Sequence, residues 1–304
     1  MFSVVIPLFN KEKSVRNTIS SVLNQTVADF ELLVINDGST DKSREIVADI
    51  QDSRIRIVDK PNGGVSNTRN EGIKFASNTY VALLDADDLW EPDFLETIRK
   101  LIADYPEAEC YTTGFACKYE AETLNVFGAK KRGIITDFFK QMYVGPVMNS
   151  SSVCIKKSVF EKVGYFNSDI RRGEDYDMWA RIARSVSIAA TPEIKVSYRL
   201  QAENRAMGLL HKPQELWLFH IPSESYRNND EKRFYRRFLH RQVLEYLLKR
   251  KFNWAWQIAA HNWKTASWYS YFFLPASLQS RQLASWVKLL RKRFFGKKEW
   301  LLPG

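Results

Sequence analysis

Histidine is missing from the first two hundred residues of this 304-residue chain. The four histidines all come later, and they are His211, His220, His240 and His261. A general base in the first part of the chain would therefore have to be a carboxylate. Cysteine is also scarce, and the three cysteines lack the spacing of a disulfide framework or a zinc site, which favours a reducing compartment. They are Cys110, Cys117 and Cys154.

Three further absences narrow the class of protein. The chain has no uninterrupted apolar run of about 18 residues, so we expect no ordinary transmembrane helix. Met1 leads directly into the strand-like segment FSVVIPLF without a basic leader, so we also expect no signal peptide. No G-x-G-x-x-G motif follows this first strand, which argues against a dinucleotide-dependent oxidoreductase.

The net charge of +10 is carried by the last third of the chain. From Arg205 onward there are 19 Lys and Arg residues against 6 Asp and Glu, whereas the preceding part is slightly acidic. The same region is rich in Trp, Tyr and Phe in helical patterns. We therefore predict two regions, an α/β domain over residues 1–210 and a basic, aromatic helical region over residues 211–304.

Short apolar runs alternate with helical patterns through the first half of the chain. The predicted strands cover residues 2–9, 30–36, 54–59 and 80–85, and the predicted helices cover 14–25, 41–50, 65–76 and 92–104. Such alternation predicts an α/β fold with a mostly parallel, Rossmann-like sheet flanked by helices. Nearly continuous apolarity in the strands indicates a sheet that is covered on both faces. Ligands of such sheets bind beyond the carboxyl ends of the strands, so the residues there are the candidates for a site.

Three carboxylates follow the fourth predicted strand in the segment DADD: Asp85, Asp87 and Asp88. Grouped carboxylates repel one another, and a Mg²⁺ or Mn²⁺ ion that also bridges a diphosphate would relieve this repulsion. The alternative is a helix cap, which Asp88 is placed to provide for the next helix. Capping accounts for one aspartate but not for the whole group.

Two other segments place polar residues at the same edge. Asp37 follows the second strand, where it suits either a turn or a hydrogen bond to a nucleoside. The segment PNGGVSNTRNEGI opens a helix whose amides favour phosphate, and Arg69 lies about one turn into it. The alternative for Arg69 is a surface position.

A second acidic group, in the segment GEDYDMW, lies at a predicted helix start. Its members are Glu174, Asp175 and Asp177. Acidic residues there interact favourably with the helix dipole, which is the structural alternative. Because no histidine is nearby in sequence, this group is also the best source of a general base for an attacking hydroxyl.

Seven segments occur in an order and spacing that resemble family-2 glycosyltransferases of the GT-A fold, and the resemblance covers about residues 2–205. They are VVIPLFN, VINDGSTD, GGVSNTRNEGI, LLDADDLW, SSVCIKKSVFEKVGYF, GEDYDMWARIA and YRLQ. The resemblance, which extends to bacterial enzymes of cell-surface polysaccharides, implies an inverting transfer of a sugar from a nucleotide-diphosphate donor to a hydroxyl of a glycan or lipid-linked acceptor. It also implies Mn²⁺ or Mg²⁺ as cofactor and a role in O-antigen, capsule or exopolysaccharide synthesis.

The resemblance also implies roles for individual residues. Asp175 would be the general base and Glu174 would lie close to the donor sugar or the acceptor. Asp87 would ligate the metal. The nucleotide sugar would be bound by Pro7, Phe9, Asp37, Arg69 and Asp85.

Two departures from the family pattern are visible. Many relatives carry a histidine after the YR of the last strand, where this chain has Gln201, and His211 is a conceivable substitute. The Q-x-x-R-W signature and the membrane spans of processive synthases are missing, which favours transfer of a single sugar.

Residues 280–300 predict a basic amphipathic helix with Trp286 and Phe294 on its apolar face. Such a helix suits an anionic membrane surface, and the family resemblance implies the inner face of the cell membrane, so we expect a cytoplasmic protein with peripheral membrane contact. The alternative is packing on the catalytic domain or on a second subunit, which leaves an oligomer open. No RNA- or DNA-binding module is present, so we expect no nucleic-acid partner.

Two other functions compete with glycosyl transfer. An inactive GT-A scaffold acting through its helical tail is disfavoured by the retained acidic residues Asp37, Asp85, Asp87 and Asp175. A nucleotidyltransferase would need a glycine-rich triphosphate loop after the first strand, and PLFNKEKS has no glycine. Donor sugar, nucleobase, acceptor and linkage stay open.

Overall fold

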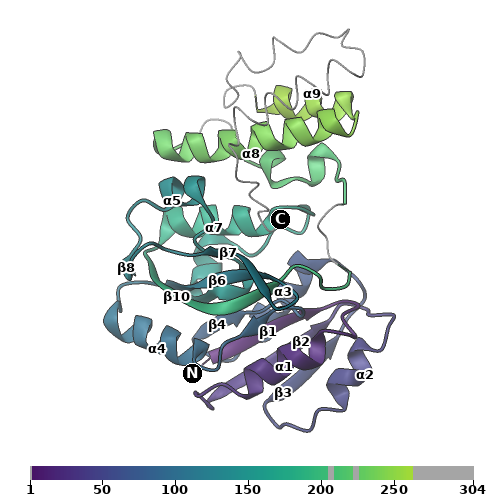
Figure 1. The fold of residues 1–304 in the computed structure, drawn as a ribbon, viewed down its shortest axis with the longest axis vertical. Coiled ribbons are helices and arrows are strands. Elements are labelled where there is room, and N and C mark those ends of the chain that lie inside the picture. The colour runs from purple at the N-terminus through teal and green to yellow at the C-terminus, as the bar shows by residue number, and fades with distance from the viewer. Residues whose placement is uncertain (1, 205–208, 222–225, 263–304) are drawn as a thin grey trace. The chain divides into compact units, whose positions relative to one another are not determined.

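The computed structural model describes residues 2–204, 209–221 and 226–262 of the chain (Figure 1). The chain divides into two compact units, Met1–Ala206 and Met207–Gly304. The first unit holds the sheet and the second consists of helices in its described part. The roles that the sequence suggests for the two regions stay predictions.

The first half of the large unit alternates strand and helix, as the sequence predicts. Its elements are β1 (Phe2–Leu8), α1 (Val15–Leu23), β2 (Phe30–Asn36), α2 (Ser43–Ala48), β3 (Ile55–Asp59), α3 (Val65–Phe75) and β4 (Tyr80–Leu83). The four strands are parallel, and β1 and β2 are buried along nearly their whole length. Such strands need apolar residues on both faces because helices cover the sheet on either side.

The chain changes direction across the sheet between β1 and β4. It runs outward from β1 to β2 and β3, and then returns to place β4 on the other side of β1. In this register Leu8 lies beside Asn36 and Val5 beside Leu83, so the segments after the three strands emerge at one edge. A reversal of strand order in a parallel sheet leaves a crevice at the carboxyl ends, which is where ligands of such sheets bind.

The second half of the unit extends the sheet with strands of both directions. Its elements are β5 (Leu89–Trp90), α4 (Phe94–Asp104), β6 (Cys110–Tyr119), β7 (Glu122–Phe127), β8 (Gly133–Ile134), α5 (Phe138–Val144), η1 (Ser150–Ser152), β9 (Val153–Lys156), α6 (Ser158–Val163), α7 (Glu174–Ser185) and β10 (Ile188–Arg199). Within the described residues the strands form one sheet in the order β3-β2-β1-β4-β9-β6-β10-β5, with β7 on β6 and β8 on β10.

The predicted α/β class is confirmed, with one refinement to the strand directions. The sheet is parallel from β3 to β4, and beyond β4 it is mixed, because β9 is antiparallel to both β4 and β6. The sequence does not reveal this change, since an apolar strand such as β9 has the same residue types in either direction. The expected strands and helices of the first half end within about three residues of their predicted limits.

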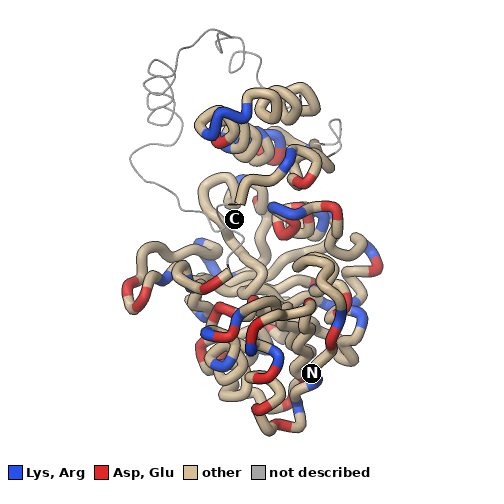
Figure 2. Tube along the Cα trace, turned by 90° about the vertical axis from the view of Figure 1, so that its right-hand side faces the viewer, with Lys and Arg blue, Asp and Glu red and all other residues tan. Residues whose placement is uncertain are grey.

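The described part of the second unit is helical. It contains η2 (Pro213–Glu215), η3 (Trp217–Phe219), α8 (Asn229–Leu248) and α9 (Phe252–His261). The Trp217 ring packs against rings of α8, and the centroid distances are 5.8 Å to Phe234, 5.3 Å to Tyr235 and 5.4 Å to Phe238. Most of the charged residues of α8 are Lys and Arg (Figure 2). None of the described helices is both long enough and apolar enough to cross a membrane.

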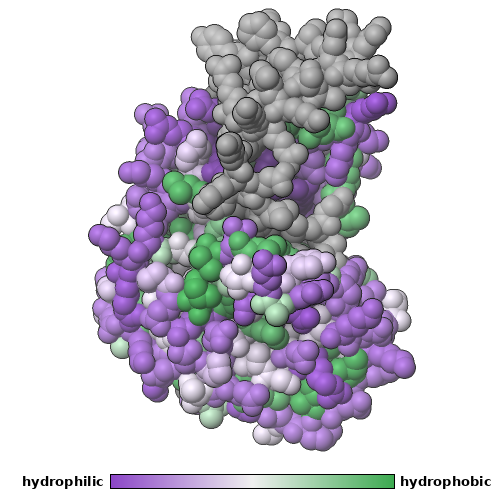
Figure 3. Space-filling view, in the orientation of Figure 1, coloured by the Kyte–Doolittle hydropathy of each residue, from purple (hydrophilic) through white to green (hydrophobic). Residues whose placement is uncertain are grey.

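Most of the surface seen in Figure 3 is hydrophilic, and hydrophobic side chains form separate groups on it. In the second unit, exposed apolar side chains lie where α8 meets α9: Leu248, Phe252 and Trp256 are 52%, 53% and 69% exposed. The predicted amphipathic helix over residues 280–300 lies outside the described residues.

Candidate active site

Arg69 brings together carboxylates from two distant parts of the chain. Its Nη2 lies 2.8 Å from Asp85 Oδ1, after β4, and its Nη1 lies 2.9 Å from Glu174 Oε1, at the start of α7. The Arg69 side chain is only 4% exposed. Burial by itself would lower the pKa of Arg69, but the Asp85 and Glu174 carboxylates outweigh it and raise the pKa above its ordinary value. The surface position that the sequence left open for Arg69 is therefore excluded.

Asp175 is half-buried beside this ion-pair group. Burial raises the pKa of Asp175 to about 7, and the neighbouring Glu174 charge adds to the rise, whereas Arg69 opposes it. Its Oδ1 accepts a hydrogen bond from the Tyr176 amide at 2.8 Å. A carboxyl that titrates near neutral pH can accept a proton from a hydroxyl and can also release it, as a general base must.

The start of α7 is positioned by a glycine. Gly173 precedes Glu174 with a positive φ of 81°, a left-handed conformation that glycine adopts without strain. The turn thereby directs Glu174 and Asp175 toward Arg69. Asp177, the third acidic residue of this group, instead accepts hydrogen bonds from Arg181 one turn further on at 3.0 and 2.7 Å. The structure thus separates Asp177 from the other two.

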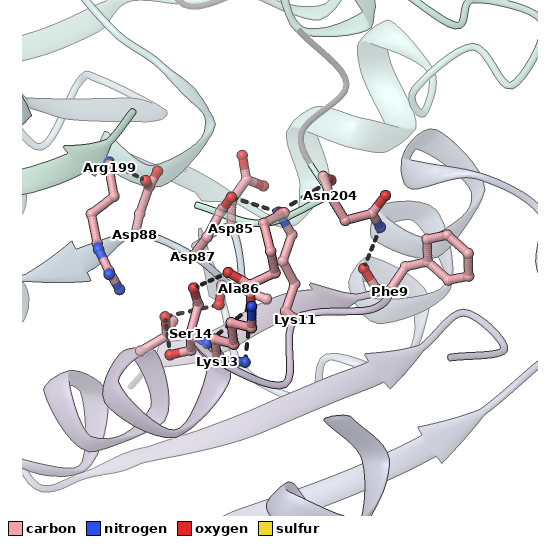
Figure 4. Close-up of polar contacts among 12 residues, drawn as sticks. Phe9, Lys11, Lys13, Ser14, Asp85, Ala86, Asp87, Asp88, Arg199 and Asn204 are labelled. Atoms are coloured by element: carbon pink, nitrogen blue, oxygen red, sulfur yellow. Dashed lines mark hydrogen bonds and ion pairs between the residues drawn. The ribbon is translucent and has the colours of Figure 1, made fainter. Parts of the chain in front are cut away.

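Asp87 faces a lysine that follows the first strand. The Lys11 Nζ lies 2.6 Å from Asp87 Oδ2, and their side chains are 11% and 14% exposed (Figure 4). Lys11 lies in the β1–α1 connection and Asp87 in the β4–β5 connection, so the two sides of the strand-order reversal meet here. Asp85 and Asp87 therefore have different partners, because Asp85 binds Arg69 and Asp87 binds Lys11.

Asp88 does not cap the next helix, contrary to the sequence-based prediction. Helix α4 begins at Phe94 and its N-cap residue is Asp93. Asp88 is buried instead, where it accepts hydrogen bonds from the Ser151 hydroxyl and from the Arg199 amide at 3.1 Å. Burial, followed by the charges of Asp87 and Asp85, raises the pKa of Asp88 well above its ordinary value. The prediction failed because β5 intervenes between DADD and the helix.

Asp37 holds the glycine-containing loop before α3. Its Oδ1 accepts a hydrogen bond from the Gly63 amide at 2.8 Å, its Oδ2 accepts one from the Gly64 amide at 2.9 Å, and it forms an ion pair with Lys60. These two amides were predicted to favour phosphate, but in the structure they donate to the Asp37 carboxylate. Among the described residues, only the Gly64 amide donates to Oδ2, which leaves this oxygen a lone pair for a further donor.

The remaining candidates lie along the same edge. Pro7 is half-buried in β1 and Phe9, just after it, is 36% exposed. Gln201 is exposed after β10. His211 belongs to the second unit, where its Nδ1 lies 3.9 Å from the Glu215 carboxylate.

The carboxylates suit a divalent cation only if a ligand contributes to its coordination. Among the described residues, no group of three or more His, Cys, Asp or Glu side chains is arranged to hold a metal. Mg²⁺ and Mn²⁺ commonly bind through one or two carboxylates together with substrate phosphates, and Asp85 and Asp87 offer oxygens of that kind. The donor set therefore fits a cation that is shared with a diphosphate.

Three residues near Asp87 were not predicted from the sequence: Lys11, Glu203 and Asn204. Lys11 donates to the Asp87 carboxylate and to the carbonyl oxygens of Glu203 and Asn204. Lys11 follows β1 at the ligand edge, so the rule that directs attention to strand ends would have found it. Glu203 has no comparable signal, because its contacts join segments about 190 residues apart.

Comparison with known proteins identifies the family of this chain. Residues 3–164 match the model of the family "Glycosyl transferase family 2". An uncharacterized glycosyltransferase of Haemophilus influenzae is 29% identical over 235 residues, which are 71% of this chain and 70% of that protein. A chondroitin synthase of Pasteurella multocida is 38% identical over 116 residues, which are 37% of this chain but only 12% of that longer protein.

The fold has counterparts among solved structures. Staphylococcus aureus TarS 1–349 in complex with UDP superposes with a TM-score of 0.62 at 16% identity, over 80% of this chain and 71% of that one. A complex of the same protein with UDP-GlcNAc gives a TM-score of 0.56 at 17% identity, over 96% and 82% of the two chains. The α/β unit is thus a GT-A fold of the kind that glycosyltransferases use. The chain belongs to glycosyl transferase family 2.

Proposed function

We propose that this glycosyltransferase transfers a single sugar, with inversion, from a nucleoside-diphosphate donor to a hydroxyl of a glycan or lipid-linked acceptor. The observation that carries the proposal is the half-buried Asp175, with its raised pKa, beside the Arg69–Asp85–Glu174 ion pairs, at the edge where a donor of this fold would lie. We further propose that the product belongs to a cell-surface glycan such as O-antigen, capsule or exopolysaccharide. The named relatives include a chondroitin synthase, which supports polysaccharide synthesis as the setting.

Asp175 is the proposed general base. As the acceptor oxygen attacks the anomeric carbon, its proton passes to the Asp175 carboxylate. The bond between that carbon and the diphosphate oxygen breaks, and the nucleoside diphosphate leaves with the electron pair. Attack from the face opposite the leaving group inverts the configuration. A base with a pKa near 7 suits this step at neutral pH.

Arg69 and Glu174 are proposed to shape the space around the reacting carbon. Arg69 fixes the Asp85 and Glu174 carboxylates, which leaves Glu174 positioned to accept hydrogen bonds from the donor sugar or the acceptor. The nucleoside of the donor would bind in a separate pocket, which we propose is lined by Pro7, Phe9, Asp37 and Asp85. The half-exposed ring of Phe9 offers an apolar surface for a base.

A Mn²⁺ or Mg²⁺ ion, when bound with the diphosphate, would supply Lewis-acid stabilisation of the negative charge that develops on the leaving group. Asp87 is the residue that we propose to hold it. Asp85, already paired with Arg69, is proposed to contact the ribose side of the nucleotide.

The chain is also proposed to act at the inner face of the cell membrane as a peripheral protein. The apolar side chains exposed where α8 meets α9 adjoin Lys249, Arg250 and Lys251 in sequence. Aromatic side chains beside basic ones favour an anionic lipid surface. The basic segment 280–300 is proposed to add to the same contact.

A donor screen tests the proposal. The purified chain is heated with UDP-, GDP- and dTDP-linked sugars, each with Mn²⁺ or with EDTA, and unfolding is followed by thermal shift. We expect one nucleotide class to raise the unfolding temperature, because ligand that binds only the folded chain stabilises it. The stabilising donor is then incubated with glycan and lipid-linked acceptors, and release of nucleoside diphosphate is measured. If no nucleotide sugar shifts the unfolding temperature, the proposed function is wrong.

A further inference from the structure

Lys11 is held by an all-oxygen site. Its Nζ lies 2.6 Å from Asp87 Oδ2, 2.6 Å from the Glu203 carbonyl oxygen and 3.3 Å from the Asn204 carbonyl oxygen (Figure 4). A protonated lysine has three N–H donors, and these three oxygens match them in number. One carboxylate and two carbonyl oxygens are also the ligand types that a hard cation such as Mg²⁺ or Mn²⁺ prefers. The lysine ammonium thus takes a place that would suit a small cation.

The oxygen site is fixed from both sides. Glu203 accepts hydrogen bonds from the Lys13 and Ser14 amides at 3.0 Å each and from the Ser14 hydroxyl at 2.7 Å. Asn204 donates to the Phe9 carbonyl at 3.0 Å. These bonds secure the segment after β10 to the β1–α1 connection, so the two carbonyls that face Lys11 do not depend on Lys11 alone for their position.

The charge balance at Asp87 bears directly on donor binding. A diphosphate is strongly negative, and a carboxylate close to it must be neutralised before the two can approach. In this family the neutralising charge is expected to be a divalent cation. Here Lys11 already neutralises the Asp87 carboxylate, in a place where both side chains are largely shielded from water.

We propose that Lys11 is a positioning residue that serves as an internal counter-cation at the donor's diphosphate. It neutralises Asp87 when no divalent ion is bound, and it competes with that ion for Asp87 Oδ2 and the two carbonyls. This inference rests on the proposed function and extends it to the cation requirement. The chain therefore retains affinity for a nucleoside diphosphate without a divalent ion. This affinity depends less on the ion than it would if the Asp85 and Asp87 carboxylates had no lysine beside them.

The test compares two affinities for each variant. The full chain is titrated calorimetrically with UDP, GDP or dTDP, whichever it binds, once in EDTA and once in saturating Mn²⁺. The quantity of interest is the Kd in EDTA divided by the Kd in Mn²⁺. We expect Lys11→Met to raise this ratio about tenfold or more, chiefly through weaker binding in EDTA, because the Asp87 charge then opposes the diphosphate.

Three companion variants separate charge from fold. Lys13→Met removes an equal charge from an exposed side chain two residues away and should leave the ratio unchanged. Lys11→Arg keeps the charge and should keep binding in EDTA. Lys11→Met with Asp87→Asn removes both charges, so it should recover binding in EDTA and lose the effect of Mn²⁺. The unfolding temperature of each variant, followed by circular dichroism, shows that the comparison is made on folded protein.

A direct metal titration provides a second measurement. Free Mn²⁺ is followed by electron paramagnetic resonance without nucleotide, and Lys11→Met should bind Mn²⁺ more tightly than the wild-type chain. Equal ratios for Lys11→Met and Lys13→Met, with unchanged Mn²⁺ affinity, would overturn the role of Lys11 and leave the proposed function standing. A wild-type chain that binds no nucleoside diphosphate in either buffer would overturn both.

Discussion

At the scale of single residues, the site depends on how burial and neighbouring charges divide five acidic side chains among different partners. Asp85 binds a buried arginine, Asp87 binds a lysine, and Asp88 is buried with a hydroxyl and an amide. Glu174 shares Arg69 with Asp85. Desolvation and the Glu174 charge raise the pKa of Asp175 to about 7. Identical residue types thereby acquire different chemistry from their surroundings.

Asp175→Asn tests the proposed base. We expect transfer to fall about a hundredfold or more with little change in donor affinity, because the amide cannot accept the hydroxyl proton. In the wild-type chain the ionised fraction of Asp175 grows as the pH rises through about 7, so the rate of transfer should rise over the same range. Rate–pH profiles of both proteins measure this, and an unchanged profile in the variant would refute the assignment.

The raised pKa of Asp175 also predicts how Asp175→Asn changes the stability of the chain with pH. The Asp175 carboxyl binds its proton more tightly in the folded chain than in the unfolded one, so stability is lost as the pH rises from its ordinary pKa of 3.8 to about 7. The charges that face it are Glu174, Arg69 and Asp85. Asn carries no such penalty, so Asp175→Asn should unfold at a higher temperature than the wild type at pH 8. The difference should shrink toward pH 5, where the wild-type carboxyl is protonated.

At the scale of elements, the position of Arg69 depends on how closely α3 lies against the sheet. Gly72, three residues after Arg69, faces β1 so closely that an added Cβ would lie 2.2 Å from Val5 Cγ1 and 3.2 Å from Ile35 Cγ1. Both side chains are fully buried and have no space to move into. The glycine therefore lets α3 approach the sheet, and this distance sets how far the Arg69 guanidinium extends toward Asp85.

Gly72→Ala should destabilise the chain although alanine favours helices. We expect a loss of about 1–3 kcal/mol in the free energy of unfolding from overpacking, which exceeds the gain in helix propensity of about 1 kcal/mol. Urea unfolding followed by circular dichroism measures it. Lys74→Ala, an exposed change in the same helix, is the control and should lie within about 0.5 kcal/mol of the wild type. Equal stabilities of the two variants would show that α3 can move away from β1 freely.

At the scale of the whole molecule, the excess positive charge and the proposed active site are found in different units. The first unit carries the acidic site, whereas the excess of Lys and Arg lies beyond Arg205. Within the described residues of the second unit, Phe252 and Trp256 are exposed one helical turn apart on α9. A basic unit with exposed aromatic side chains suits contact with an anionic bilayer.

Liposome flotation tests this membrane contact. We expect the wild-type chain to float with vesicles that contain anionic lipid and not with neutral vesicles, since the attraction is partly electrostatic. Phe252→Ser with Trp256→Ser should float less. The matched control is Tyr143→Ser with Val144→Ser on α5, where the side chains are 42% and 49% exposed. If the α9 variant floats as well as the α5 variant, α9 does not contact the membrane.

The sequence by itself determined the elements and the edge of the sheet where the site lies. The alternation of apolar runs with helical patterns follows from local burial, so β1 to β4 and the intervening helices were predictable, as was the family from its ordered segments. The gathering of Asp37, Asp85 and Asp87 at one edge was predictable too, because carboxyl ends of parallel strands meet there.

Only the tertiary structure decided which side chains meet. The pairing of Arg69 with Glu174 joins residues 105 positions apart, and that of Lys11 with Asp87 joins residues 76 apart. Such contacts depend on strand order and helix packing, which local residue patterns do not encode. The change from Asp88 as a helix cap to Asp88 as a buried acid has the same origin, because Ser151 reaches it from η1 and Arg199 from the end of β10.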